Sequence, residues 1–260
     1  MFRKLIALTA ASLLCILVSA CASFESCAPL YAKDIELSKQ KGDVVTSVFG
    51  QFVSFPLPEG FAQVFEGLEN NTFILQAIPK GNAVFWTHTI TFTGIKRSTS
   101  KYPNATPAQL VNLMANSFKR KCPDSYATQG LGPVKLDGHD GFAAVVSCGV
   151  ISFGGAPYSE SILVILVKGE SNYYSVQWTE KGEASKTPLK LERAKWEDRF
   201  KQLTPIKLYP IIPGEKSSDP ACVNPGASVP TNPSRKNNQN SKVAWISAAL
   251  SRATRASQQS

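Results

Sequence analysis

The first twenty residues carry the feature that most restricts what the rest of the chain can become. Arg3 and Lys4 precede an apolar run over residues 5–18 that only two polar residues interrupt. A positive start followed by a short apolar stretch is typical of an export signal, and about fourteen residues are too few to cross a bilayer comfortably as a helix. We therefore expect residues 1–20 to be a signal peptide and the remainder to fold outside the cytoplasm, in an oxidising compartment.

The apolar run ends in Val18-Ser19-Ala20-Cys21, which resembles the lipobox of bacterial prolipoproteins. That motif has a branched apolar residue, two small residues and an obligatory cysteine. The resemblance implies cleavage between Ala20 and Cys21, with diacylglycerol on the Cys21 thiol and an acyl group on the freed amine. One acyl chain holds a protein only marginally, at about 0.8 kcal/mol for each buried methylene, so two or three chains make a lasting membrane anchor.

The residues after Cys21 bear on the destination. Ala22 and Ser23 stand where the family's sorting rule would place aspartate to retain a protein at the inner membrane. In Gram-negative members the resemblance implies an outer-membrane lipoprotein that faces the periplasm. The alternative is an ordinary secreted protein cleaved after Ala22, because Ala20 and Ala22 also satisfy the small-x-small cleavage rule. Cys15 does not compete for the lipid, because Leu14 is too bulky for the position before it.

The net charge of +9 is the feature of the composition that could suggest a nucleic-acid partner. Arg3 and Lys4 contribute two of these charges, and residues 211–260 carry six basic and two acidic side chains. The residues between hold a net charge of only +3, so no dense basic face with interleaved aromatic residues follows. We expect no nucleic-acid partner.

Four cysteines remain once Cys15 leaves with the signal peptide and Cys21 carries lipid. Cys27, Cys122, Cys148 and Cys222 form an even number, which suits disulfides, and three pairings are possible. We favour Cys122 with Cys148, because a helix that ends at Cys122 and packs on the strand of Cys148 would bring the two together. Cys27 and Cys222 would then tie the two ends of the domain. The spacing of the cysteines matches no zinc motif.

Residues 43–210 have the pattern of one β-rich domain with two helices. Alternation and turn residues predict strands over residues 44–55, 73–78, 84–93, 134–136, 140–151, 161–167 and 173–179. In the 84–93 strand, Trp86, His88, Ile90 and Phe92 alternate with threonines, which predicts one core face and one solvent face. The strand over 161–167 is apolar on both alternations, so we expect it to be central and covered on both sides.

Two helix starts are visible. Thr106, Pro107 and Gln109 form an N-cap, a first-turn proline and a capping box, and Cys122-Pro123 ends this helix. Thr187-Pro188 predicts a second helix, whose buried stripe is expected to contain Leu189, Trp196, Phe200 and Leu203. The order of elements predicts an α+β fold, a mostly antiparallel β-sheet with two main helices packed on one side.

The domain is flanked by segments of different composition. Residues 21–42 lack a sustained period and are expected to be a tether behind the lipidated cysteine. Residues 211–260 are rich in Pro, Ser, Asn and Lys and cannot bury enough apolar surface to order themselves, so we expect a mostly disordered basic tail. Residues 243–253 are the exception, because their apolar spacing predicts a short amphipathic helix.

The run Phe55-Pro56-Leu57-Pro58-Glu59-Gly60, together with a late helix after a tryptophan-bearing strand, resembles PsbP-type domains over residues 46–208. Members of that family mostly serve as partner-binding subunits. The resemblance implies an α+β domain of the same kind and a non-enzymatic binding function.

The residues that could carry catalysis or hold a metal are few. His88 lies among apolar residues and is more simply a core or edge histidine than a catalytic one. His139 lies next to Asp140 at a hairpin tip, where turn chemistry accounts for both residues. Neither histidine has a placed serine or cysteine nucleophile to complete a triad. We expect no cofactor, no metal and no enzymatic activity.

Three functions remain. The leading hypothesis is a membrane-anchored envelope lipoprotein whose domain binds an envelope protein, as an accessory subunit of an assembly. The alternative is a periplasmic or secreted binding protein for a small apolar ligand held between sheet and helices. A third is attachment to cell-wall polysaccharide through the basic tail. An internal cavity with converging polar groups would favour the second, whereas a filled core would favour the first.

Overall fold

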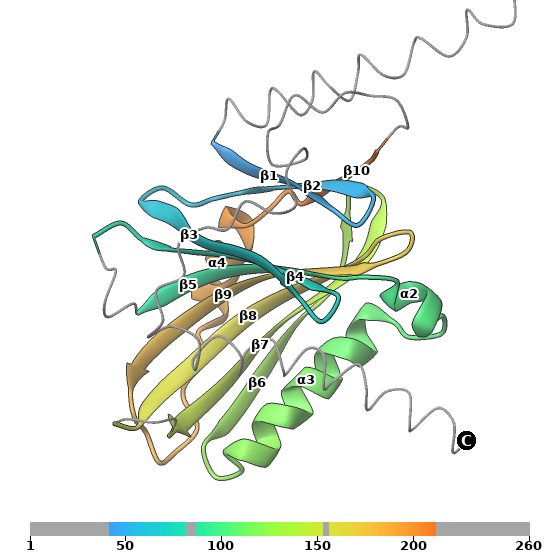
Figure 1. Ribbon diagram of the computed structural model, residues 1–260. Coiled ribbons are helices and arrows are strands. Elements are labelled where there is room, and N and C mark those ends of the chain that lie inside the picture. The colour runs from blue at the N-terminus through green and yellow to red at the C-terminus, as the bar shows by residue number, and fades with distance from the viewer. Residues whose placement is uncertain (1–41, 82–86, 153–155, 212–260) are drawn as a thin grey trace, which may run out of the picture.

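The computed structural model describes residues 42–81, 87–152 and 156–211 (Figure 1). The predicted signal peptide, nearly all of the tether and the tail therefore lie outside the described residues. The strands are β1 (Asp43–Val48), β2 (Gln51–Pro56), β3 (Phe61–Glu69), β4 (Thr72–Pro79), β5 (His88–Ile95), β6 (Tyr126–Leu136), β7 (His139–Ile151), β8 (Tyr158–Lys168), β9 (Tyr173–Glu183) and β10 (Lys207–Pro210). The helices are α2 (Ser98–Lys101), α3 (Pro107–Lys121) and α4 (Arg193–Gln202).

The strands form two antiparallel sheets. The large sheet has the order β3-β4-β5-β9-β8-β7-β6, and the small sheet has the order β1-β2-β10. Every strand pairing is antiparallel. The predicted α+β fold with a mostly antiparallel sheet is confirmed. The division into two sheets was not predicted.

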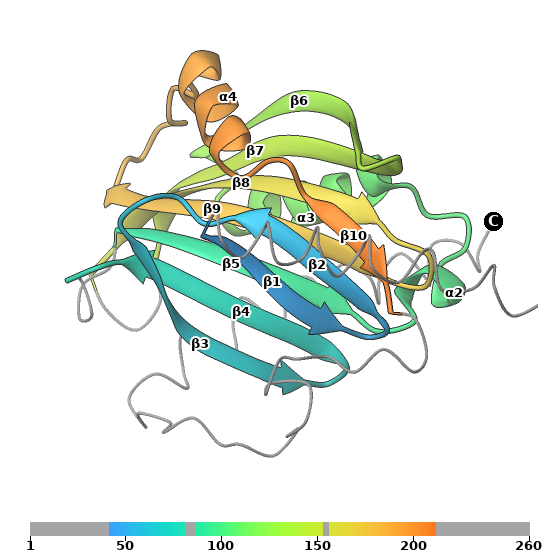
Figure 2. The same cartoon turned by 90° about the horizontal axis from the view of Figure 1, so that it is seen from above.

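One face of the large sheet is closed by the small sheet and α4 (Figures 1 and 2). The core between these layers is rich in large side chains, and Phe55 of β2 lies 5.4 Å from Phe92 of β5 between ring centroids. Tyr174 stacks on Phe92 at 6.1 Å, and Trp196 of α4 is buried in the same cluster. We call this side of the sheet the closed face.

The opposite face carries α3, which packs mainly on β7 and also contacts β6 and β8. The inner side of this helix is apolar and packs on the side chains of β7 and β8 that point to this face. Its buried residues include Leu110, Val111, Met114 and Phe118. We call this side of the sheet the α3 face. Figure 2 shows α4 on the other side of the sheet, so the prediction that both helices lie on one side is wrong. The reason is that β8 is apolar on both alternations and needs cover on both faces.

Several local predictions are confirmed. α3 begins at Pro107 with Thr106 as N-cap, and both hydrogen bonds of the capping box are present. The β6–β7 hairpin turns at Asp137 and Gly138, whose φ values of 51° and 81° are those that a tight Asp-Gly turn requires. β8 is buried along its central residues, and β9 pairs with it with Val176 and Trp178 facing the core.

Other boundaries were wrong. Residues 44–55 form two strands, because Phe49 and Gly50 turn the chain with φ values of 51° and 88°. β3 was not predicted, since its alternation mixes half-buried and exposed residues. The second helix starts at Arg193, with Glu192 as N-cap, and Thr187-Pro188 precedes it as irregular chain. Of its expected stripe, Trp196 and Leu203 are buried, whereas Leu189 and Phe200 are only half-buried.

The threonines of β5 also contradict the sequence prediction. β5 starts at His88, and Trp86 lies outside the described residues. Thr89, Thr91 and Thr93 were expected to face solvent, but all three are buried. β5 lies inside the sheet between β4 and β9, and Thr93 Oγ1 forms a hydrogen bond with Ser175 Oγ of β9 at 2.7 Å. Such a cross-strand hydrogen bond lets a polar side chain be buried at little cost.

Candidate functional site

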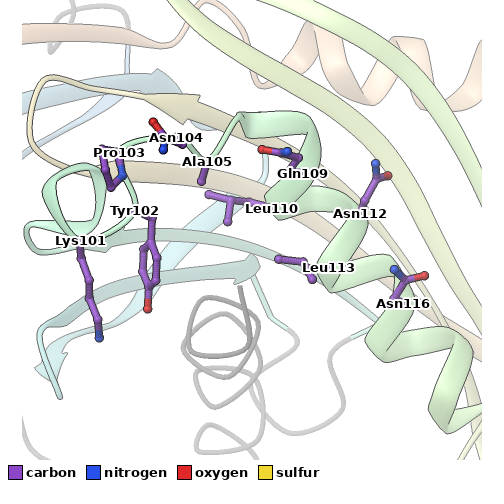
Figure 3. Close-up of a pocket in the computed structure, with 10 residues that line it drawn as sticks. All are labelled: Lys101, Tyr102, Pro103, Asn104, Ala105, Gln109, Leu110, Asn112, Leu113 and Asn116. Atoms are coloured by element: carbon purple, nitrogen blue, oxygen red, sulfur yellow. The ribbon is translucent and has the colours of Figure 1, made fainter. Parts of the chain in front are cut away.

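A groove runs beside the N-terminal half of α3 (Figure 3). Its volume is about 490 Å³, and we call it the α3 groove. Its lining consists of residues 101–105, from the end of α2 and the loop that follows it, together with Gln109, Leu110, Asn112, Leu113 and Asn116 of α3.

Local interactions hold the loop and the helix start in place. Thr106 Oγ1 accepts a hydrogen bond from the Gln109 backbone N–H at 3.2 Å, and Gln109 Oε1 accepts one from the Thr106 N–H at 2.8 Å. The hydroxyl of Tyr173 on β9 donates to the carbonyl of Ala105. The groove is therefore built on a capped helix and a loop tied to the sheet.

The chemistry of the groove is that of a binding surface. Tyr102 and Leu110 are buried and give the groove an apolar base, to which half-buried Leu113 adds. Exposed carboxamides at Asn112 and Asn116 can donate and accept hydrogen bonds beside that base. Among the described residues that line the groove there is no carboxylate, imidazole or thiol. The lining offers shape and hydrogen bonds, and its ionisable groups are the Lys101 ammonium and the Tyr102 hydroxyl.

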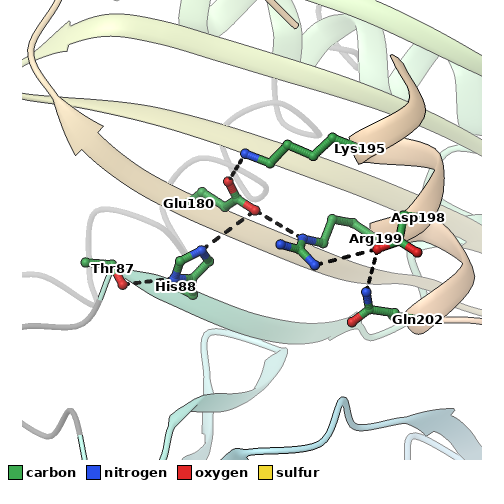
Figure 4. A network of polar contacts seen from close by, with 7 residues as sticks. All are labelled: Thr87, His88, Glu180, Lys195, Asp198, Arg199 and Gln202. Carbon is green, nitrogen blue, oxygen red and sulfur yellow. Dashed lines mark hydrogen bonds and ion pairs between the residues drawn. The ribbon is translucent and has the colours of Figure 1, made fainter. Parts of the chain in front are cut away.

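A second cluster lies on the closed face, where α4 meets β5 and β9 (Figure 4). The carboxylate of Glu180 on β9 accepts hydrogen bonds from Lys195 and from Arg199, the latter at 3.2 Å. His88 Nε2 lies 3.8 Å from the same carboxylate. The guanidinium of Arg199 also stacks over the Trp178 ring at 4.4 Å. Glu180 is largely shielded from solvent, so these contacts fix α4 on the closed face of the large sheet.

His88 begins β5, an interior strand of the large sheet, and its side chain is partly exposed. Its Nδ1 lies 2.9 Å from the hydroxyl of Thr87, the preceding residue. The hydroxyl, the imidazole and Glu180 are thus adjacent, but two cations already neutralise the carboxylate. Glu180 is therefore poorly placed to polarise the imidazole in the way that a triad requires.

His139 and Asp140 lie at the start of β7, next to the hairpin turn. Asp140 forms an ion pair with Lys135, which lowers the pKa of the exposed Asp140 carboxyl below its usual value. Within the described ranges, no three His, Cys, Asp or Glu side chains are grouped so that they could hold a metal ion. The hairpin tip thus carries an ion pair between Lys135 and Asp140.

The structure contains the Cys122–Cys148 disulfide, with a Cα–Cα distance of 5.8 Å. It joins Cys122, the C-cap of α3, to the C-terminal part of β7, so the helix end packs on the strand as the pairing requires. Cys21, Cys27 and Cys222 lie outside the described residues, so the lipidation site and the second pairing stay predictions.

The core under the closed face is filled by aromatic rings. Phe73 lies 5.9 Å from Phe92, and Phe61 lies 5.3 Å from Trp178, between ring centroids. Phe55, Phe92 and Tyr174 are at most 1% exposed. Aromatic side chains therefore pack the space between the large and the small sheet.

Sequence reasoning did not single out the α3 groove. Gln109, Asn112 and Asn116 recur at helical spacing of three and four, a carboxamide stripe that could have indicated a polar contact surface on the outer side of the helix. No sequence pattern marks Tyr102 as a lining residue. Its place in the groove depends on the path of the chain between α2 and α3.

The chain matches no protein-family model and no curated protein. Among solved structures, a Bacteroides thetaiotaomicron protein is 14% identical with a TM-score of 0.29, and the match covers 64% of this chain and 47% of that one. LpqN, involved in cell envelope biogenesis of Mycobacterium tuberculosis, is 10% identical with a TM-score of 0.33, and the match covers 65% of this chain and 91% of LpqN. The Pseudomonas aeruginosa protein PA94, a putative regulator, is 11% identical with a TM-score of 0.33 over 63% of this chain and 96% of PA94. These likenesses are too low to assign a function.

Proposed function

We propose that this chain is an exported lipoprotein of the bacterial cell envelope that binds a partner protein and has no catalytic activity of its own. The observation that carries the proposal is Val18-Ser19-Ala20-Cys21 at the end of a short apolar run with a basic start. Lipid on Cys21 would hold the domain at the outer membrane, facing the periplasm. A soluble secreted or periplasmic protein is the alternative.

Two features of the domain support this assignment. Across the described ranges, no helix is long and apolar enough to cross a membrane. The Cys122–Cys148 disulfide suits a protein that matures in an oxidising compartment. A lipid anchor on an exported domain is consistent with both features.

The partner-binding part of the proposal is supported by the α3 groove. An apolar base beside exposed carboxamides is the mixture found where proteins contact one another, and Tyr102 is of a residue type that such contacts favour. The filled core argues for a partner on the surface in preference to a small apolar ligand inside. The groove on α3 and its preceding loop is therefore the surface to test first.

Cell fractionation tests the anchor. We expect the parent protein in the membrane fraction and a Cys21→Ala variant in the soluble fraction or as unprocessed precursor. A Cys15→Ala variant is the matched control, because it removes a leader cysteine outside the lipobox and should leave the protein at the membrane. Membrane association of the Cys21→Ala protein in mature form would contradict lipidation.

Site-specific crosslinking in living cells tests the partner. A photo-crosslinking amino acid at position 112 or 116 should give one shared adduct, because the two side chains are one helical turn apart and both line the groove. The matched control is position 197, exposed on α4 on the closed face of the sheet, which should not give that adduct. Adducts at position 197 alone, or none at either groove position, would exclude the α3 groove as the contact.

A further inference from the structure

The carboxamides of the α3 groove follow one side of the helix. Gln109, Asn112 and Asn116 all line the groove (Figure 3). The Oε1 atom of Gln109 is already used in the capping box, where it accepts a hydrogen bond from the Thr106 N–H. Asn112 and Asn116 are exposed and lie one helical turn apart, so this pair is available to a ligand in the groove.

The spacing of the two asparagines matches the repeat of an extended peptide. Residues four apart on an α-helix are separated by about 6 Å along its axis, at about 1.5 Å per residue. Residues two apart on an extended chain are separated by about 6.7 Å, and their backbone N–H and C=O groups point to the same side. A carboxamide has both donors and an acceptor, so it can pair with both groups of one peptide residue. Asn112 and Asn116 can therefore pair with alternate residues of a strand laid along α3.

The groove has room for a short piece of such a strand. From Gln109 to Asn116 the lining follows about 10 Å of helix, at about 1.5 Å per residue. An extended chain rises by about 3.3 Å per residue, so about three peptide residues lie against this part of the helix. Leu110 and Leu113 give the groove an apolar base for the side chains of one alternation of the strand.

Two cations flank the groove. Lys101 lines it and is exposed, with its Nζ atom 5.4 Å from the centroid of the Tyr102 ring. Lys168 of β8 donates a hydrogen bond from Nζ to the carbonyl of Pro103 at 3.5 Å, so its ammonium lies beside the loop that lines the groove. No lining residue has a carboxylate that could neutralise these charges.

The sequence accounts for the positive character of this region. Residues 70–123, which include α2, α3 and the loop between them, contain no Asp or Glu. Their basic residues are Lys80, Lys96, Arg97, Lys101, Lys119, Arg120 and Lys121. Glu170 contacts α2 through its backbone carbonyl, which accepts a hydrogen bond from Thr99 Oγ1 at 3.0 Å, and it does not line the groove. The lining is therefore complementary to a negatively charged partner.

We propose that the α3 groove binds an extended, acidic segment of the partner protein. Asn112 and Asn116 hold the backbone of this segment, and Lys101 pairs with a carboxylate beside them. The inference rests on the proposed function, because it names the chemistry of a partner that would bind in the same groove.

A polysaccharide fits the groove less well. Sugar rings stack on the exposed faces of aromatic side chains, but Tyr102 is only 7% exposed and the Lys101 ammonium lies over its ring. An extended peptide instead needs hydrogen bonds to its backbone and apolar contacts for its side chains, and the lining offers both.

Binding of a defined peptide to the detergent-solubilised full-length protein tests the proposal. The probe is a fluorescein-labelled peptide of alternating glutamate and valine, because β-branched residues favour an extended chain. Fluorescence anisotropy gives its dissociation constant. Lys101→Glu should weaken binding by about fivefold or more, since it reverses the charge beside the strand.

The matched control is Lys201→Glu, which makes the same charge change at an exposed position of α4 on the closed face. It should leave the dissociation constant within about twofold of the parent value. A peptide of alternating lysine and valine should bind the parent protein about tenfold more weakly than the glutamate peptide, or worse. This comparison of peptides needs no variant, so it keeps the proposal falsifiable if a substitution impairs folding.

A second comparison tests the backbone contacts. Asn112→Ala with Asn116→Ala should weaken binding of the glutamate peptide by about tenfold or more, because two pairs of hydrogen bonds are lost. The same peptide with an N-methylated backbone should bind the parent and the double variant equally weakly. A further loss in the variant would mean that the asparagines do not act on the peptide backbone.

Three outcomes would overturn the proposal. They are equal affinity of the parent and Lys101→Glu for the glutamate peptide, a preference for the lysine peptide, and binding of a chitin oligosaccharide in place of both. Failure of this inference is distinguishable from failure of the proposed function. An in-cell adduct at positions 112 and 116 without binding of the glutamate peptide would retain the groove as the contact and exclude the acidic strand.

Discussion

The two faces of the large sheet are built from the same strands but from different chemistry. On the closed face, β5 and β9 present Phe92, Val176 and Trp178, which pack against the small sheet and α4. On the α3 face the same two strands present threonines and serines, such as Thr91 and Ser175. Adjacent residues of one strand thus pack in different layers of the fold. The comparison teaches that stability resides mainly in the closed face, whereas the α3 face combines an apolar cluster under α3 with a polar strip on β5 and β9.

The largest expected effect is on the closed face. Phe92→Ala should lower the free energy of unfolding by about 3–5 kcal/mol, because it leaves a cavity among Phe55, Phe73 and Tyr174. Thr91→Val changes the neighbouring residue on the α3 face and preserves its shape, so the loss should be under about 1 kcal/mol. Urea unfolding of both variants measures the difference. Equal losses would break the contrast between the faces.

The disulfide is the strongest single tie on the α3 face. Replacing Cys122 and Cys148 together by alanine should lower the free energy of unfolding by about 2–4 kcal/mol, because it frees a loop with a sequence separation of 26. Reduction should cost the same amount in a Cys27→Ser, Cys222→Ser parent, in which Cys122–Cys148 is the disulfide that remains. In that background the alanine variant should not respond to reductant, and a response would contradict the assignment.

The Glu180 cluster should contribute less. Glu180→Gln removes the charge that Lys195 and Arg199 share, and we expect a loss of about 1–2 kcal/mol with looser packing of α4. Glu197→Gln breaks an exposed ion pair with Arg193 one helical turn away and should cost under about 0.5 kcal/mol. The melting temperatures of the Glu180→Gln and Glu197→Gln variants, measured by thermal unfolding, compare the two losses of stability. A larger loss for Glu197→Gln would mean that α4 is not held through Glu180.

Tyr174 gives an effect that is absent at neutral pH. Burial raises the pKa of its hydroxyl from 10.0 to about 12. The unfolded chain therefore loses this proton first, and stability falls as the pH rises from about 10 to about 12. Tyr158, whose pKa burial also raises to about 12, contributes in the same range. Unfolding at a series of pH values should show a weaker decline for Tyr174→Phe, and an unchanged decline would contradict the assignment.

The sequence predicted those parts of the fold that short segments determine by themselves. Thr106, Pro107 and Gln109 contain the whole capping box of α3, and Asp137-Gly138 contains the whole turn of the β6–β7 hairpin. The small sheet was not predicted, because it depends on contacts between segments that are distant in the sequence. β10 is four residues long and is defined by its pairing with β2, about 150 residues away along the chain.

The candidate sites could be predicted only in part. The Cys122–Cys148 pair followed from the expected packing of a helix on a strand. The α3 groove could not be predicted, because the path of the loop before α3 decides whether Tyr102 and Leu113 line the same groove. The contact between His88 and Glu180 joins strands 92 residues apart, and nothing near either residue in the sequence indicates the other.

The measurement that tests the central claim most directly is the intact mass of the protein extracted from membranes. We predict a mature N-terminus at Cys21 that carries the mass of diacylglycerol and an acyl chain. The Cys21→Ala variant should lack that mass. A lipid-free chain that begins at Ser23 would contradict the claim, because the protein would then be a diffusible secreted domain without Cys21.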